Sequence, residues 1–130
     1  MMESEVTAWL LRDGSGLLSS LPAANFWWDD PPETAASPLV VVRRGESDVE
    51  YNLRREIDLV RTNLVFECYA AEKLETVEIA TAVGAELGLL SGGEIFWTMF
   101  QGMPDKGYHQ PTGRFRRDVK FEIVHRESSL

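Results

Sequence analysis

Alternation of apolar and polar residues marks segment 114–126, RFRRDVKFEIVHR, near the carboxyl end of the chain. One register holds Phe115, Val119, Phe121 and Ile123, and the other holds Arg116, Asp118, Lys120 and Glu122. Successive side chains of a strand point to opposite faces, so the pattern predicts a strand with one face on a core.

Segment 56–70, EIDLVRTNLVFECYA, predicts a second long strand. Its apolar register holds Val60, Thr62, Leu64, Phe66 and Cys68, and its other register holds Arg61, Asn63, Val65, Glu67 and Tyr69. Shorter strands are expected at FWWDD, at 37–44 with burial on both faces, at 49–55 after a polar turn RGESD, and at 94–101. Residues 102–113 carry glycine and proline, so we expect a loop there that contacts a partner.

Two segments have helical periodicity. Residues 3–20 predict a helix that Gly14 and Gly16 can break into two short helices and that Pro22 ends. Residues 71–90 predict the clearest helix, whose apolar stripe holds Thr76, Ile79, Ala80, Val83, Leu87 and Leu90. Strand runs mixed with a few helices favour an α+β fold, a mostly antiparallel mixed sheet with two main helices packed on one face. We expect residues 1–130 to form a single domain.

Composition narrows the classes of function. The 130 residues carry a net charge of −8, which disfavours nucleic acid and anionic membranes as partners because both attract cationic surface. The single cysteine rules out an intramolecular disulfide and favours a reducing interior. The amino-terminal residues do not resemble a signal peptide, and no apolar run is long enough for a membrane span. We therefore expect a soluble protein made in the cytoplasm.

Candidate chemistry is sparse. His125 is expected at the half-buried end of a strand, and Cys68 in the core as a small apolar residue. The neighbours Asp29 and Asp30 diverge on an extended chain, which favours a solvated strand end over a carboxylate pair. His109 lies in the predicted loop without metal-ligand spacing around it. We expect no catalytic residues, no cofactor and no metal.

Aromatic residues and arginines are the two surpluses. Segment 94–101, EIFWTMFQ, is apolar on both predicted faces, with Ile95, Trp97 and Met99 on one and Phe96 and Phe100 on the other. Helices on both faces, a central place in a small barrel, or self-association would each cover them. Aromatics, methionine and arginine are enriched at protein interfaces. We predict a subunit interface with an aromatic patch from Trp27 or Trp28 and strand 94–101, and a second patch from the arginine-bearing strands. Its residues are Trp27, Trp28, Arg43, Arg44, Trp97, Phe100 and Arg116.

The arginine pairs and the double tryptophan leave alternatives open. Arg43–Arg44, Arg54–Arg55 and Arg116–Arg117 fit either exposed strand faces or ion pairs between subunits. In NFWWDDPP, one indole is expected beneath the helices and the other toward a neighbouring chain, and the sequence does not say which. The carboxylates and prolines mark the point where this strand leaves the sheet.

Over nearly its full length the chain resembles the phage tail-terminator and minor-tail (tail-completion) family. The resemblance lies in the order of EVTAWLLRDGSGLLSSLP, NFWW, DDPPETAASPLVVV, LVRTNLVFECYA, EKLETVEIATAVGAEL, IFWTMFQG and GRFRRDVKFEIVH. It implies a non-enzymatic homo-oligomeric ring, typically a hexamer, that terminates the tail tube and joins it to the head. Its partners would be tail-tube and head-completion proteins of a phage or prophage, and the protein would be made in the host bacterial cytoplasm and located in the virion tail. The GSG in the first helix and the double tryptophan depart from a typical member.

Two other readings remain. An acidic dimeric secretion chaperone has a similar size, charge and mixture of helix and strand, and it predicts a two-fold dimer. A small α/β-barrel enzyme would use His109 with Asp105, and it predicts an activity that His109→Ala abolishes.

Overall fold

A computed structural model describes residues 2–32, 35–51, 58–109 and 113–126. In chain order the elements are α1 (Met2–Leu10), the 3-10 turns η1 (Gly16–Ser19) and η2 (Ala23–Asn25), β1 (Phe26–Trp28), β2 (Leu39–Tyr51), β3 (Asp58–Ala70), α2 (Lys73–Leu87), β4 (Ile95–Gly102), β5 (Asp105–His109) and β6 (Arg114–Arg126). The break that Gly14 and Gly16 allow in the first helix is present, since α1 stops at Leu10 and Gly14 has a φ of 83°.

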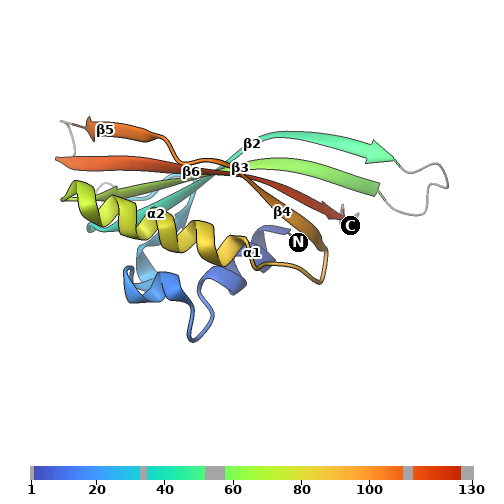
Figure 1. Ribbon diagram of the computed structural model, residues 1–130, viewed down its shortest axis with the longest axis horizontal. Helices are drawn as coiled ribbons and strands as arrows, with labels where there is room; N and C mark the ends of the chain where they lie inside the picture. Colours follow the sequence, from blue (N-terminus) through green and yellow to red (C-terminus); the bar gives the residue numbers. More distant parts are fainter. Residues whose placement is uncertain (1, 33–34, 52–57, 110–112, 127–130) are drawn as a thin grey trace.

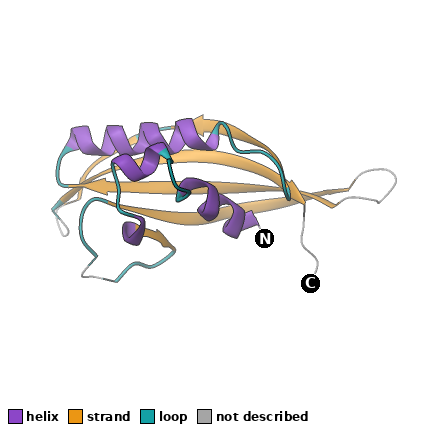
Figure 2. Ribbon diagram, turned by 90° about the horizontal axis from the view of Figure 1, so that it is seen from below, coloured by secondary structure: helices purple, strands orange, loops and turns teal. Residues whose placement is uncertain are grey.

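The six strands form one sheet in the order β1-β2-β3-β6-β4, with β5 paired to β6. Only β1 and β2 are parallel, and the other neighbours are antiparallel. Both helices lie on one face of the sheet (Figure 1), and the view from below shows them in front of the strands (Figure 2). The predicted α+β fold with a mostly antiparallel mixed sheet is confirmed.

The core lies between this face and the helices. The two long alternating strands, β3 and β6, pair along their whole length, with Leu64 opposite Phe121 and Phe66 opposite Val119. Their shared register turns both apolar faces to the same side, where these four side chains are at most 2% exposed. Alternation therefore predicted the buried face of both strands correctly, because a one-residue slip would have placed the apolar set in water.

Each helix buries a stripe at helical spacing. α1 covers the sheet with Met2, Val6 and Leu10, four residues apart, and carries Glu3 and Glu5 in its first turn, where the helix dipole favours negative charge. The predicted stripe of the second helix is confirmed, and its buried members within α2 are Thr76, Ile79, Ala80, Val83 and Leu87.

Two predictions about connections were wrong. RGESD is not a turn, because β2 runs without a break from Leu39 to Tyr51, with only a register shift between Arg44 and Ser47. The predicted loop 102–113 contains β5, which pairs with β6 from Asp105 to His109. In both cases a long partner strand offered a ladder of hydrogen bonds that outweighed poor local strand propensity. The predicted pair Arg54–Arg55 lies outside the described residues.

β4 and β5 follow one another along the outer edge of β6. β4 pairs with the segment Lys120–His125, and β5 pairs with Arg114–Arg117. Two contacts tie β4 to the helical layer. Thr98 Oγ1 donates to the carbonyl oxygen of Leu87 at 2.7 Å, and the carboxylate of Glu5 accepts from the backbone N–H of Glu94 at 3.1 Å. The strand is thus fastened at its start and in its middle.

Candidate functional site

The sheet face opposite the helices carries a network of charged side chains. Glu67 Oε2 accepts from Arg43 Nε at 3.0 Å and from Arg116 Nη2 at 3.1 Å, while Glu67 Oε1 accepts from the hydroxyl of Tyr69 at 2.8 Å. Arg116 also donates to both carboxylate oxygens of Asp118, at 2.8 and 3.0 Å. Glu67 and Asp118 are buried, at 5% and 2% exposed. Two acids and two bases balance one another within the chain, as buried charges require.

Burial and the hydrogen bond to Glu67 raise the pKa of Tyr69 to about 12, and the two arginines oppose this shift only in part. The hydrogen bond to Asp118 leads the causes that raise the pKa of Arg116. The network therefore holds Tyr69 neutral and Arg116 charged over the ordinary pH range. The residues of this network come from β2, β3 and β6, and the sequence alone did not predict that these strands are neighbours in the sheet.

The predicted interface arginines have carboxylate partners in their own chain. Arg43 and Arg116 belong to the network around Glu67, and Arg44 pairs with Glu3 of α1. Arg117 lies 3.6 Å from Asp105. An ion pair between one of these arginines and an acid of another subunit would therefore have to replace an ion pair within the chain. The arginine patch of a subunit interface stays a prediction.

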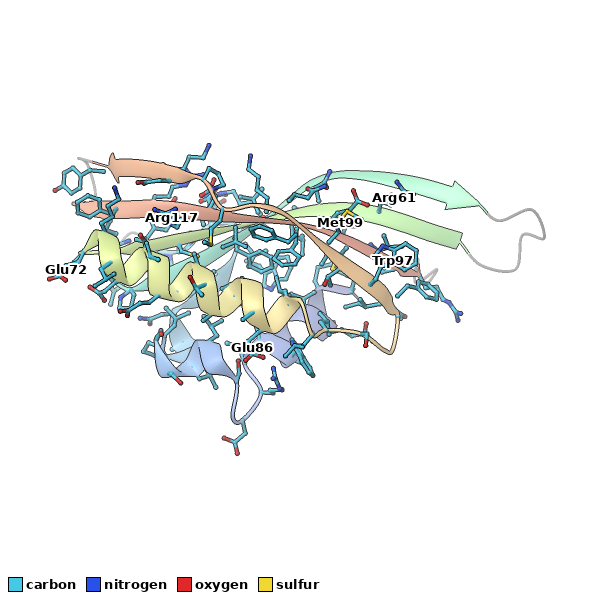
Figure 3. All side chains as sticks on the ribbon, viewed as in Figure 1. Arg61, Glu72, Glu86, Trp97, Met99 and Arg117 are labelled. Atoms are coloured by element: carbon cyan, nitrogen blue, oxygen red, sulfur yellow. The ribbon has the colours of Figure 1, made fainter. Side chains whose placement is uncertain are left out.

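Exposed apolar side chains gather on β4. Phe96 is 38% exposed, Trp97 47%, Met99 51% and Phe100 54%. Figure 3 shows Trp97 and Met99 on β4, with Trp97 in the half of the molecule away from Glu72. In the part of the chain that the structure describes, β4 pairs with β6 on one side and with no strand on the other. An apolar strand at the open edge of a sheet is a site for association.

The exposed residues of β4 lie on both faces of the sheet. Trp97 pairs with Val124 and Met99 with Glu122, which places both on the face away from the helices, whereas Phe100 pairs with Phe121 on the helical side. The Phe100 and Phe121 rings meet edge to face, with centroids 5.6 Å apart. A register shift between Ile95 and Trp97 corrects the predicted pattern, because it separates the buried Ile95 from the register of Trp97 and Met99.

The two tryptophans of NFWWDDPP have different surroundings. Trp28 Nε1 donates to Thr7 Oγ1 of α1 at 2.7 Å, and its indole packs against the core. Trp27 pairs with Val41, on the opposite face. β1 and β4 form opposite edges of the sheet, so the structure does not bring Trp27 or Trp28 together with Trp97 and Phe100. The prediction of one aromatic patch from both strands was wrong, since chain pattern alone did not give the strand order.

The described residues offer little catalytic chemistry. His125 is buried, with Nε2 2.8 Å from Thr62 Oγ1, and burial raises the pKa of the Cys68 thiol. A hydrogen bond from the backbone of Gly107 and the ammonium of Lys73 lower the pKa of Asp105. The side chain of His109 lies outside the described residues.

No cluster of three or more metal-ligating side chains occurs in the described ranges. The same ranges contain no helix with both the length and the apolar character that a membrane crossing needs. Five of the six described strands follow an open path from β1 to β4, and β5 pairs with β6 off this path, so the small-barrel reading is not supported.

The surface that this geometry singles out is therefore the outer edge of β4 with its four exposed apolar side chains, which we call the β4 edge. The sequence pattern predicted Trp97 and Phe100 of this set as interface residues, with Phe96 and Met99 on the same strand. It missed the buried network around Glu67, because acidic residues in a polar register look solvated until strand pairing places two arginines beside them.

No protein-family model and no curated protein matches the sequence. Among solved structures, the fold is similar to that of a chain from the virion of a native gene transfer agent (GTA) particle. The two share 19% sequence identity with a TM-score of 0.72, over 97% of this chain and 95% of the other. At this identity the likeness establishes a common fold.

Proposed function

We propose that this chain is a non-enzymatic structural component of a virion, of the tail-terminator or tail-completion type. In this role it assembles as a homo-oligomeric ring, typically a hexamer, on the end of a phage or prophage tail tube. The ring stops tube polymerisation and presents the surface that joins the head.

The observation that carries the proposal is the shared fold with a virion chain over nearly the whole of both chains. The order of the sequence elements also resembles that of tail-terminator proteins, and this resemblance supports the finer assignment. The β4 edge supports self-assembly, because four large apolar side chains stand exposed on one edge strand. A ring needs two different patches on each copy, and a fold with two unlike sheet edges supplies them.

The proposal is tested in the particles that the encoding phage or prophage produces. Deletion of the coding sequence is expected to give tails of uncontrolled length that do not join heads, and the wild-type gene supplied in trans should restore normal particles. Antibody labelling should place the protein at the head-proximal end of the tail. Intact, infectious particles made without the chain would refute the proposal.

Light scattering of the purified protein separates the ring from the chaperone reading. A closed ring gives a single mass several times that of the 14.7 kDa chain. A species that stays a two-fold dimer, and that binds an unfolded client, would favour the acidic secretion chaperone instead.

A further inference from the structure

The sheet has two open edges that differ in sequence. One is the β4 edge, and the other is the far part of β2, because β1 pairs only with Val40–Val42. From Gly45 to Tyr51, the described chain places no strand on the outer side of β2. Strand edges carry backbone N–H and C=O groups that a further strand can pair.

The two edges are aligned for pairing between copies. β2, β3, β6 and β4 are antiparallel in succession, so β4 runs opposite to β2. A second copy related by rotation about an axis along the strands therefore presents its β2 antiparallel to β4. The register also places Ser47 on β2 and Thr98 on β4 at the same height along the strand direction. Ser47 pairs with Thr62, Thr62 with Ile123, and Ile123 with Thr98.

The exposure pattern of β4 favours a partner strand in the plane of the sheet. Trp97 and Met99 are exposed on one face and Phe100 on the other, so a partner docked on one face would leave part of this set in water. A strand added alongside β4 brings side chains to both faces, where they contact their cross-strand neighbours.

Charge favours pairing between unlike edges. Segment 45–51, GESDVEY, contains three acidic residues and no basic residue, so two copies of this edge repel one another. The strand Ile95–Gly102, IFWTMFQG, contains no charged residue and brings no such repulsion. Pairing of β4 with β4 would leave both β2 edges open, whereas pairing of β4 with β2 occupies both kinds of edge.

We infer that β4 of one copy pairs antiparallel with the Gly45–Tyr51 segment of β2 in the next copy, so that the sheet continues from subunit to subunit. This inference rests on the proposed ring assembly and specifies the contact that builds it. The occupant of the β4 edge is thus a second copy of this chain, joined head to tail.

Cysteine cross-linking tests the pairing in the intact protein. Gln101 lies on β4 with its side chain exposed, and Ser47 lies on β2, so Gln101→Cys and Ser47→Cys label the two edges. The native Cys68 is fully buried and serves as the unreactive background. The double variant, treated with a flexible bis-maleimide, is expected to give a ladder of covalent multimers up to the mass of the oligomer. Each single variant should stay uncross-linked at the same protein concentration.

Peptide mass spectrometry should then identify the link between the two labelled strands. Cross-linking of Gln101→Cys alone would show β4 facing β4 and overturn the inference, as would an oligomer of the double variant that gives no ladder. In these two cases the virion role stands, because the deletion phenotype judges it separately. A double variant that remains monomeric at all concentrations also overturns the inference.

Discussion

Truncation of Trp97 is the most direct perturbation of the β4 edge. The residue is 47% exposed. A fully buried tryptophan covers about 200 Å², so roughly 100 Å² of Trp97 remains for a neighbour to cover. At about 25 cal/mol per Å², covering this area stabilises each contact by about 2.5 kcal/mol, or roughly 70-fold in the association constant between copies.

The expected result for Trp97→Ala is therefore an association constant roughly 70-fold weaker, measured by sedimentation or light scattering over a concentration series. The circular dichroism spectrum should be unchanged, because the main core lies on the other face of the sheet. Leu74→Ala is the matched control. Leu74 is 66% exposed on α2, two residues after Glu72, which Figure 3 shows at the end of the molecule far from Trp97. Equal association of Trp97→Ala and wild type, with both folded, would refute the reasoning, as would equal weakening by Leu74→Ala.

Three further outcomes follow from the structure. Trp28→Ala should lower the free energy of unfolding by about 2–3 kcal/mol in urea denaturation, because it removes an indole packed against the core and its hydrogen bond to Thr7. The loss is smaller than for a fully buried tryptophan, since this indole is partly exposed. Burial raises the pKa of Tyr69 to about 12, so the stability that neutral Tyr69 contributes is complete below about pH 10 and is lost as the pH rises toward 12. Ultraviolet absorbance should show one tyrosine that ionises near pH 12, and Tyr69→Phe should remove this transition. If all tyrosines ionise near pH 10, the contact between Tyr69 and Glu67 does not form in solution. Copies with a charge of −8 repel one another, so raising the salt from about 0.05 to about 0.5 M should strengthen assembly, whereas weakening would indicate ion pairs between subunits.

Sequence patterning predicted the elements whose two faces differ most. The alternating strands around Phe66 and Phe121 and the helix stripe around Ile79 and Val83 were predicted with the correct buried sides, because burial on one face imposes a period that residue types report directly. β5 and the middle of β2 were missed because their pairing depends on β6 and β3, which lie far along the chain.

The candidate site was predictable only in part. The excess of apolar surface on segment 94–101 was visible in the sequence, and Trp97 and Phe100 are indeed exposed. Strand order was not visible, so Trp27 and Trp28 were joined to a patch at the opposite edge of the sheet. The arginines looked available for the same reason, since their carboxylate partners Glu67 and Glu3 come from other elements.

The two fastenings of β4 to the helical layer bear on how copies would meet. The carboxylate of Glu5 accepts a hydrogen bond from the backbone just before β4, and the carbonyl oxygen of Leu87, at the end of α2, accepts one from Thr98 in the middle of β4. The strand is thus preorganised in the monomer, and the loss of backbone entropy is incurred during folding rather than at the encounter. Loosening it by Thr98→Val should therefore slow docking of a neighbour even though no atom of the contacting surface is removed.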